Sequence, residues 1–527
     1  MTASLGLRSS TALLALACAL LNWNCGGAER KPNFVVIVLD TLRPDHLGCY
    51  GHTRDTSPNL DRWAAQSVVF ENAQTAAPWT APSLISLMTS LYPNVHQVAT
   101  FYEPGQMNER VTTLAEVLRE RGYWTGAFTD GGYAKPQFGL GQGFQTYPLN
   151  SGDTPDQHAS NVANPRRLRS NVDRTLKWLD EVQEEPFFLF FHTYEIHGLY
   201  QPPEEYVKRY RPSWDEAAEH AKLEEVKRGW VERKEIDAAG LRLLLAHVEH
   251  CAAAKEMDKS GLPARMRELG IGSMEPERME LWRDLYDAEI RHTDHELERL
   301  LARLDTPQLR DNTVVVFVSD HGEGFGEHGT IGHGSVLHEE NLRVLLMLRA
   351  PGVAPRRVKD VVRTVDVMPT ALELLGAART DLALQGRSLT PLLRGDKLPP
   401  APSFSHALSL IGGESRLWSV REGDWRLIWD SQANAARLYD LAKDPLELND
   451  VAAQNTQIAE RLMGVLRAQC EVDAAFFGRA SGPIGTLYAF DQSTQNELKA
   501  LGYVNDSAAP AGDVLPRGIE RPNYCGH

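Results

Sequence analysis

The sequence predicts an α/β fold, with a central sheet in a large first part and a smaller α+β part near the carboxyl terminus. Continuous apolar, β-branched runs recur along the first part of the chain, and helical patterns separate them. This alternation is typical of α/β domains. From about residue 395 the composition shifts, and apolar and polar residues alternate as in antiparallel strands.

Three of the apolar runs are predicted to be buried strands. They are NFVVIVLD (33–40), PFFLFFHTYEIH (186–197) and the run that opens TVVVFVSDHGEGFGEHG (313–329). Segments that are apolar on both faces are typical of parallel strands covered on both sides. All three end in polar residues, and ligands bind at the carboxyl ends of strands in open α/β sheets. We therefore expect the functional site at that edge of the sheet.

The remaining segments receive simpler predictions. The pattern at 112–123 indicates a helix, and the charge-rich stretch 204–303 is predicted to be helical, covering the domain and controlling substrate access. The segment 395–480 is predicted to form the smaller α+β part. The tail at 505–527 is rich in Ala, Pro, Gly and Asp, which indicates a flexible segment.

Residues 1–25 are interpreted as a targeting segment. Arg8 precedes an apolar run from about Thr11 to Leu21, which is too short to span a bilayer comfortably. Cys25, followed by two glycines, is similar to a bacterial lipoprotein cleavage site, and Cys18 is a rival site. An ordinary cleaved signal peptide and a membrane anchor are the alternatives. Export is favoured, to the periplasm or as an outer-membrane lipoprotein, with the membrane reached only through an N-terminal lipid.

Composition argues against nucleic acid as a partner. The 527 residues include 55 basic and 70 acidic ones, a net charge of −15, and no dense basic run. Four cysteines lie outside the leader: Cys49, Cys251, Cys470 and Cys525. They form no C-x-x-C metal pattern and are compatible with one or two disulfides.

Asp40, Asp320 and His321 are the candidate metal ligands. Asp40 ends the first run, and Asp320 and His321 stand side by side after the third. Alone, such residues often form caps or salt-bridged turns. Carboxylate and imidazole groups together also make a mixed site for a divalent cation, with positions left open for substrate. The glycine-rich stretch that follows allows close backbone approach. We predict a divalent metal ion here, whether Ca²⁺, Mn²⁺ or Zn²⁺.

Thr80 is the candidate nucleophile. In APWTAPSLISLMTSLYP (77–93) it stands at the head of a predicted short helix, with Pro82 in the first turn. The simpler interpretation is an N-cap. The functional interpretation is that a hydroxyl in the positive potential of a helix N-terminus, beside the predicted metal ion, ionises and attacks an ester. The two are compatible. Ser83, one turn further, is predicted to help cap the helix or to bind the anion.

Two histidines are candidates for proton transfer and substrate binding. His197 and His333 both follow predicted strand ends on the metal-bearing side. A lone histidine is more often structural, but one of these two can protonate the leaving oxygen while the other binds the anionic group. Weaker, supporting or structural roles are assigned to three others: His192, His328 and His338.

Nine motifs follow one another between about residues 33 and 480. They are VVIVLDTLRPDHLGCYG, APWTAPSLISLMTSLYP, FFLFFHTYEIHGLYQPP, YDAEIRHTDHELERLL, VVVFVSDHGEGFGEHG, GHGSVLHEENLRV, VDVMPTALELLG, LQGRSLTPLL and WRLIWDSQANAARLYDLAKDPLELND. With these motifs the chain resembles the sulfatase family of the alkaline phosphatase superfamily. The resemblance implies a large alkaline-phosphatase-like catalytic domain (33–394) with a mixed central sheet. It also implies a small C-terminal subdomain (395–480) with a four-stranded sheet.

The resemblance also implies roles for individual residues. Metal binding is implied for Asp40, Asp320 and His321. Thr80 stands in the nucleophile position, and His197 matches a histidine close to the substrate. His333 falls where a lysine or histidine contacts the transferred group. Thr41 stands where many sulfatases have a second aspartate ligand, which puts that ligand in doubt.

This chain departs from the family pattern at the nucleophile. Sulfatases typically carry C-x-P-x-R, or serine for the cysteine, and the first residue is oxidised to formylglycine. Here the same stretch starts at Thr80 and ends at Leu84, so no formylglycine is expected. The lysine and histidine usual after the next helix are also missing from AFTDGGYAKPQFG. Superfamily relatives with a threonine nucleophile act on phosphoryl groups. Their second metal site would require an acid at Thr193, so one ion is expected.

The leading hypothesis from the sequence is an exported, metal-dependent hydrolase of sulfate or phosphate esters. Its substrate would be a small-molecule, glycan or lipid ester. The first alternative is a threonine-nucleophile phosphodiesterase or phosphoryl transferase. The second is a non-catalytic homologue that binds an anion.

Overall fold

The computed structural model describes residues 30–98, 106–148, 166–182, 185–198, 200–215, 276–408 and 416–480. The predicted leader (1–25), the predicted tail (505–527) and residues 216–275 of the predicted helical stretch lie outside these ranges. Within them, two parts of that stretch are helical, as predicted: α8 (Glu204–Tyr210) and α13 (Pro276–Leu304).

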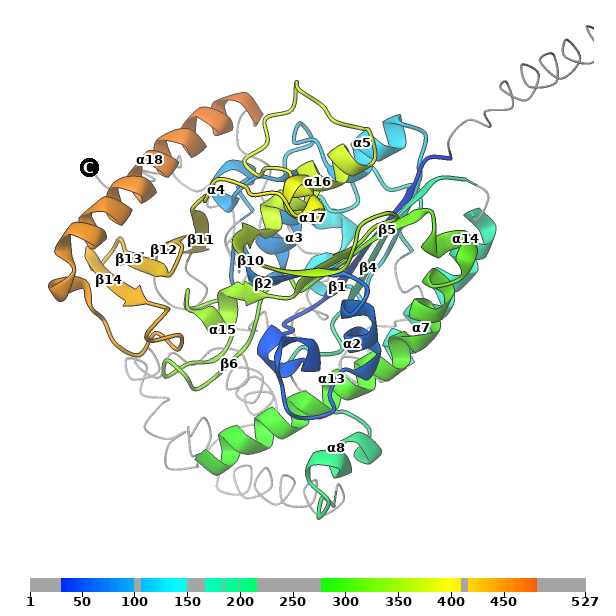
Figure 1. The fold of residues 1–527 in the computed structure, drawn as a ribbon, viewed down its shortest axis with the longest axis horizontal. Helices are drawn as coiled ribbons and strands as arrows, with labels where there is room; N and C mark the ends of the chain where they lie inside the picture. Colours follow the sequence, from blue (N-terminus) through cyan, green and yellow to red (C-terminus); the bar gives the residue numbers. More distant parts are fainter. Residues whose placement is uncertain are drawn as a thin grey trace, which may run out of the picture.

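Eight strands form one mixed sheet, in the order β10-β2-β9-β5-β1-β4-β3, with β8 paired to β2 (Figure 1). The bounds are Asn33–Leu39 (β1), Val68–Gln74 (β2), Trp124–Phe128 (β3), Phe187–Thr193 (β4), Thr313–Val318 (β5), Arg343–Val344 (β8), Leu346–Arg349 (β9) and Arg356–Arg363 (β10). Strands β3, β4, β1 and β5 are parallel, whereas β9 runs antiparallel to β5 and β2. The predicted α/β class is confirmed.

The three runs predicted as buried strands are the centre of this sheet. Every residue of β1, β4 and β5 is buried, as their apolar composition requires. Because β4 and β5 both pair with β1 in parallel, their carboxyl ends meet at one edge. The amide of Asp40 extends the ladder by donating to the carbonyl of Thr193 at 3.2 Å. The polar residues after each strand are thereby brought to the same place.

Helices cover both faces of the sheet (Figure 1). Alternate residues of β1 point to opposite sides: Phe34 belongs to one hydrophobic core and Val35 to the other. The first core is closed by α3 (Thr80–Thr89), α4 (Pro93–His96), α5 (Leu114–Glu120), α16 (Val367–Leu374) and α17 (Thr390–Arg394). The second is closed by α2 (Pro58–Ala64), α7 (Arg166–Val182), α13 and α14 (Pro307–Arg310).

A second sheet lies beside the first and is antiparallel throughout (Figure 1). Its strands are β11 (Ser403–Leu408), β12 (Arg416–Glu422), β13 (Trp425–Asp430) and β14 (Ala435–Asp440), and α18 (Thr456–Ala480) packs on it. The alternating pattern that predicted antiparallel strands in this region is therefore confirmed. The boundary at residue 395 stays a prediction.

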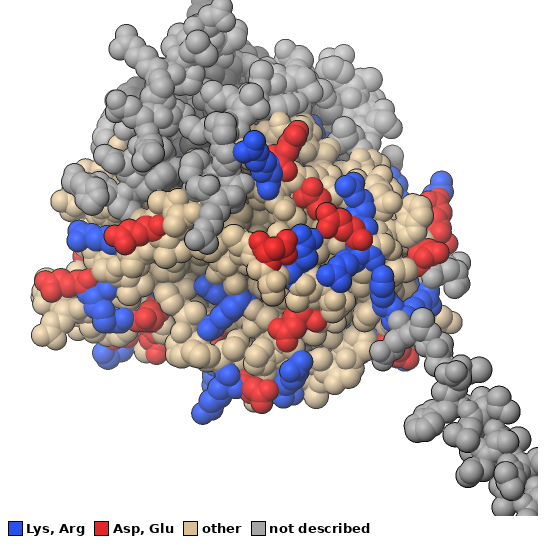
Figure 2. Space-filling view, turned by 90° about the horizontal axis from the view of Figure 1, so that it is seen from above, with Lys and Arg blue, Asp and Glu red and all other residues tan. Residues whose placement is uncertain are grey.

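The surface carries both signs of charge. On the face seen in Figure 2, Lys and Arg side chains are interspersed with Asp and Glu, and neither sign gathers into a patch. Among the described residues, no helix is both long and apolar enough to cross a membrane.

Candidate active site

Three strands deliver the centre of the site. Asp40 directly follows β1, His192 lies within β4, and Asp320 comes two residues after β5. The His192 Nε2 atom lies 3.1 Å from Asp40 Oδ2, and the amide of Thr41 donates to Asp320 Oδ1 at 3.3 Å. All three side chains are buried. One ligand atom from each lies within 4.8 Å of the others, so they form a group that can hold a metal ion.

His321 completes this group. Its Nδ1 lies 2.9 Å from the carbonyl oxygen of Gly322. Because a carbonyl can only accept, Nδ1 carries the proton, and in the neutral ring Nε2 presents a lone pair. Nε2 lies 3.5 Å from Asp320 Oδ2 and 3.8 Å from Asp40 Oδ1. A lone pair facing two carboxylate oxygens is the arrangement expected of ligands around a cation.

The electrostatics of the cluster favour the same conclusion. Burial, together with the nearby Asp320 carboxylate, raises the pKa of Asp40 well above its ordinary value. Burial lowers the pKa of His192 to about 4, which keeps the ring neutral and able to bind a metal. Asp40 Oδ1 and Asp320 Oδ2 are buried without a hydrogen-bond partner. A divalent cation would satisfy both oxygens and compensate their charge, so the residues present fit such an ion.

Thr80 points into this cluster. It is the first residue of α3, and the N-cap position belongs to Trp79, so the capping interpretation of Thr80 is wrong. Its hydroxyl donates to Asp40 Oδ2 at 3.2 Å and lies 3.4 Å from His321 Nε2. The helix therefore presents a hydroxyl, rather than a capping oxygen, to the two predicted metal ligands.

Ser83 has a local role in the structure. Its hydroxyl donates to the carbonyl of Ala77 at 2.7 Å and lies 3.1 Å from the hydroxyl of Thr75. Both partners belong to the loop that joins β2 to α3. These bonds hold the loop that precedes Thr80.

The two other predicted histidines lie together beside His321. The ring centroid of His333 is 4.4 Å from that of His321 and 4.9 Å from that of His197. His333 Nδ1 lies 3.0 Å from Glu323 Oε1, which fixes the orientation of the ring. Both rings are almost fully buried. The structure therefore brings every predicted site residue except Ser83 to one end of the central strands.

The structure adds three residues that were given no direct role in the sequence analysis. His192 was assigned a supporting role but belongs to the group that can hold a metal ion. Glu323 orients His333. The Tyr194 phenol accepts from the amide of Tyr133 at 3.0 Å, and burial and Asp40 raise its pKa far above the ordinary value, so it stays neutral. The available signal was His192 itself, which together with Thr193 follows the apolar run FFLFF within β4.

Two residues of the predicted motifs, Thr41 and Gly322, have structural roles in contact with backbone carbonyl groups. Thr41 adopts a left-handed conformation with φ of 56°, and its hydroxyl donates to the carbonyl of Ile196 at 2.9 Å. It therefore braces the segment after β4. A β-carbon on Gly322 would collide with the carbonyl oxygen of Glu340, so only glycine fits beside His321. The close approach predicted from the glycines is to the protein's own backbone.

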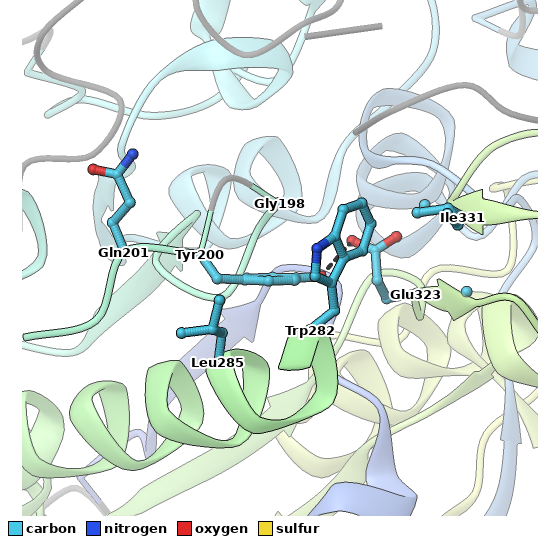
Figure 3. Close-up of a pocket in the computed structure, with 9 residues that line it drawn as sticks. Gly198, Tyr200, Gln201, Trp282, Leu285, Glu323 and Ile331 are labelled. Carbon is cyan, nitrogen blue, oxygen red and sulfur yellow. Dashed lines mark hydrogen bonds between the residues drawn. The ribbon is translucent and has the colours of Figure 1, made fainter. Parts of the chain in front are cut away.

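A cavity of about 110 Å³ lies beside Glu323, the residue that orients His333 (Figure 3). Tyr200 and Gln201 from the segment after β4 line one side, and Trp282 and Leu285 from α13 line another. Glu323 also lines it, accepting from the Tyr200 hydroxyl at 3.1 Å. Cavities of this size hold one benzene-sized group. It is open to a small part of a substrate next to His333.

The fold and the site define an ester hydrolase of the alkaline-phosphatase-like superfamily. The chain belongs to the sulfatase family, whose Sulfatase model matches residues 32–377. A second model, described as N-sulphoglucosamine sulphohydrolase, C-terminal, matches residues 326–471.

Individual relatives agree with this family. An arylsulfatase of Clostridium perfringens is 25% identical over 80% of this chain and 90% of its own length. An N-acetylgalactosamine-6-O-sulfatase of Bacteroides thetaiotaomicron is 24% identical over 84% of this chain and 94% of its own length. The crystal structure of a phosphonate monoester hydrolase of Agrobacterium radiobacter shares the fold, with a TM-score of 0.64, 22% identity, and coverage of 83% of this chain and 96% of that one.

Proposed function

We propose that the protein is an exported, divalent-metal-dependent hydrolase of sulfate or phosphate esters, with Thr80 as its nucleophile. The observation that carries this proposal is the bond from the Thr80 hydroxyl to Asp40, inside a cluster of buried and uncompensated carboxylates. A threonine kept only for structure would have no reason to direct its hydroxyl at such a cluster.

The cation is assigned to the residues Asp40, His192, Asp320 and His321. Their unpartnered oxygens and the neutral ring of His192 support this assignment. A bound divalent cation lowers the pKa of a neighbouring hydroxyl and stabilises negative charge on the oxygens of the ester. The identity of the ion is left to experiment, among Ca²⁺, Mn²⁺ and Zn²⁺.

The remaining chemistry belongs to the side chains. Thr80 Oγ1 bonds to sulfur or phosphorus, and its proton passes to Asp40 Oδ2, which already accepts it in a hydrogen bond. The ester bond to the alcohol oxygen breaks, and His333 or His197 donates the proton that this oxygen needs. Glu323 holds the His333 ring for that transfer. Water then attacks the ester on Thr80 and gives a proton to that histidine, and Asp40 returns its proton to Thr80 Oγ1, which releases the inorganic anion and restores the hydroxyl.

The substrate is proposed to be a small-molecule, glycan or lipid ester. The relatives named above support sulfate and phosphonate esters as the reacting group. The cavity beside Glu323 and His333 would take part of the alcohol component, against the ring of Trp282 (Figure 3).

Thr80 makes phosphoryl transfer the second candidate function. Threonine cannot be converted to formylglycine, so the sulfate chemistry usual in the family would not be available. Leu84, where the family has arginine, is fully buried in the core that α3 closes. It offers no donor to an aldehyde hydrate. A phosphodiesterase or phosphoryl transferase that uses a threonine nucleophile is therefore retained beside the sulfatase proposal.

Export rests on residues 1–25 alone, through a signal peptide or a lipid on Cys25. Mass spectrometry of the mature protein from its native host tests this part. A mature chain that begins at a lipidated Cys25 is the expected result. A chain that retains Met1 would contradict export by cleavage.

The chemistry is tested with a panel of aryl sulfate, phosphate monoester, phosphodiester and phosphonate monoester substrates. Thr80→Ala is expected to lower kcat/KM at least ~10³-fold on every substrate that the wild type turns over. Thr89→Ala is the matched control, since its buried hydroxyl, at the far end of α3, bonds only within the helix and its cap.

The panel also separates the candidates. Turnover of sulfate esters alone would exclude the phosphoryl-transfer function, and the reverse pattern would exclude the sulfatase function. Unchanged turnover in Thr80→Ala would remove the nucleophile assignment. Absence of turnover with each of the three metal ions would favour an anion-binding homologue.

A further inference from the structure

A second acid–histidine cluster lies outside the active site. Glu195 follows β4, whereas Glu289 and His292 stand three residues apart on the same face of α13. One ligand atom from each lies within 4.8 Å of the others. The side chains are 9%, 5% and 4% exposed, so water does little to compensate their charges.

The contacts inside this cluster are those of ligands rather than of hydrogen-bond partners. His292 Nδ1 lies 3.3 Å from Glu195 Oε1 and 3.7 Å from Glu289 Oε1, yet it is buried with no hydrogen bond to either. Around a tetrahedral metal ion with bonds near 2.1 Å, neighbouring ligand atoms lie about 3.4 Å apart. The other oxygen of Glu289 is held by the amide of Gln201 at 3.1 Å, which leaves Oε1 directed at His292.

The cluster also carries more negative than positive charge. Its two carboxylates face a single imidazole, so one negative charge stays uncompensated when all three groups are ionised. A divalent metal ion bound by the neutral imidazole would compensate both carboxylates.

A neighbouring acid–histidine cluster on the same helix differs because an arginine compensates its negative charge. Asp287 contacts His46 at 2.6 Å and His52 at 3.3 Å, which resembles the arrangement at His292. There, however, Arg54 lies 2.8 Å from the Asp287 carboxylate and supplies the positive charge. The ion-pair partners that the structure gives to Glu195 and Glu289 include only His292, within the described part of the chain.

We propose that Glu195, Glu289 and His292 form a second binding site for a divalent transition-metal ion, with Zn²⁺ as the best match. Two carboxylates and an imidazole suit Zn²⁺ or Mn²⁺ better than Ca²⁺. The ion would have a structural role. It would fasten the segment that carries Glu195, two residues before His197, to α13. It shares no ligand with the active site, and the inference does not depend on the proposed function.

The test measures Zn²⁺ binding to the chelator-stripped full chain in the background of Asp40→Asn and Asp320→Asn, which disables the active-site cluster. One equivalent of Zn²⁺ is expected by isothermal titration, together with a rise in the midpoint of thermal unfolding. Adding His292→Gln is expected to abolish both. Adding His295→Gln, one turn further along α13 and outside the cluster, is expected to preserve both.

Two outcomes would overturn the proposal. The background variant would bind no Zn²⁺, or it would bind the same amount with His292→Gln as without it. If the background variant does not fold, the wild type and Glu289→Gln replace it, with metal content measured by mass spectrometry. Two equivalents falling to one would support the site, and equal content would refute it.

Discussion

Buried carboxylates occur in two parts of this molecule, with opposite charge environments. At the junction with the second sheet, Glu447 and Glu339 meet Arg426, with a distance of 2.8 Å from Arg426 Nε to Glu447 Oε1. Arg421 contacts Glu339 at 2.9 Å. Burial alone would raise the pKa of Glu339, but these arginines lower it. In the active site the ion-pair partners of Asp40 are His192 and His321, and its pKa is raised.

The difference shows that burial and the charge of the neighbouring side chain together decide whether a carboxylate is ionised. Where the chain supplies an arginine, the carboxylate stays ionised and joins two parts of the fold. Where it supplies only imidazole rings, ionisation is penalised until a cation arrives from solution. The junction is therefore a structural crosslink, and the active-site cluster is suited to a ligand. Three predictions test this contrast.

The largest effect is expected for Asp40→Asn. Loss of a proposed metal ligand should lower kcat/KM at least ~10³-fold. The free energy of unfolding of the metal-free protein should stay equal or rise, because the substitution removes a buried charge that nothing compensates. Activity assays and urea unfolding of the chelator-treated protein measure the two quantities. A clear loss of metal-free stability would mean that Asp40 and His192 form a structural ion pair.

A smaller effect, on stability rather than turnover, is expected for Arg426→Met. Removing this arginine leaves Glu447 buried without its arginine partner, whereas Glu339 keeps Arg421. Breaking a buried ion pair in this way typically costs about 3–5 kcal/mol of unfolding free energy. Arg379→Met is the matched control, since Arg379 also contacts two carboxylates but at the exposed surface. Its unfolding midpoint should not change measurably. Equal losses of unfolding free energy in the two variants would show that the buried ion pairs at the junction stabilise the fold no more than exposed ones.

The smallest effect concerns pH and Asp130, a third buried carboxylate. It accepts from the Thr193 hydroxyl at 2.6 Å and the Tyr194 amide at 3.0 Å, but burial raises its pKa to about 6. The folded state therefore holds a proton that the unfolded state releases near pH 4. Its contribution is full below pH 4 and is lost as the pH rises through about 6, roughly 2–3 kcal/mol in all.

Asp130→Asn isolates this contribution, because the amide stays neutral at every pH. The difference in unfolding free energy between wild type and variant should change across the window from pH 4 to 7 and stay constant outside it. Urea unfolding at several pH values measures the difference. A constant difference across that window would show that Asp130 is ionised in the folded protein throughout.

The centre of the fold was predictable because nearly every residue of its strands is apolar, which indicates burial on both faces. In β1, β4 and β5 both faces are covered, so the runs are apolar except for one or two residues at an end of each strand. The edge strand β10 has the sequence RRVKDVVR and is partly exposed. Its pattern carries little signal until its partner β2 is known, and the sequence analysis did not identify it.

The site was less predictable than the sheet. Asp40, Asp320 and His321 follow strand ends, a position that the sequence reveals. His192 lies inside a strand, and only the register of β4 against β1 brings it to Asp40. Thr80 is a good capping residue by type, but the chain enters α3 one residue earlier, at Trp79. A cap and the proposed nucleophile differ here by one residue of register, which residue preferences do not resolve.

Helix α13 does not tolerate insertions between Trp282 and His292, because it aligns two features along one face. One face carries Trp282 and Leu285 in the wall of the cavity and, further along, Glu289 and His292. Trp282 and His292 are separated by roughly 15 Å of helix at 1.5 Å per residue. A single inserted residue between them would turn everything beyond it by about 100°. A side-chain replacement on α13 alters one of these features at a time, whereas an insertion between them would misalign the cavity wall and the acid–histidine cluster at once.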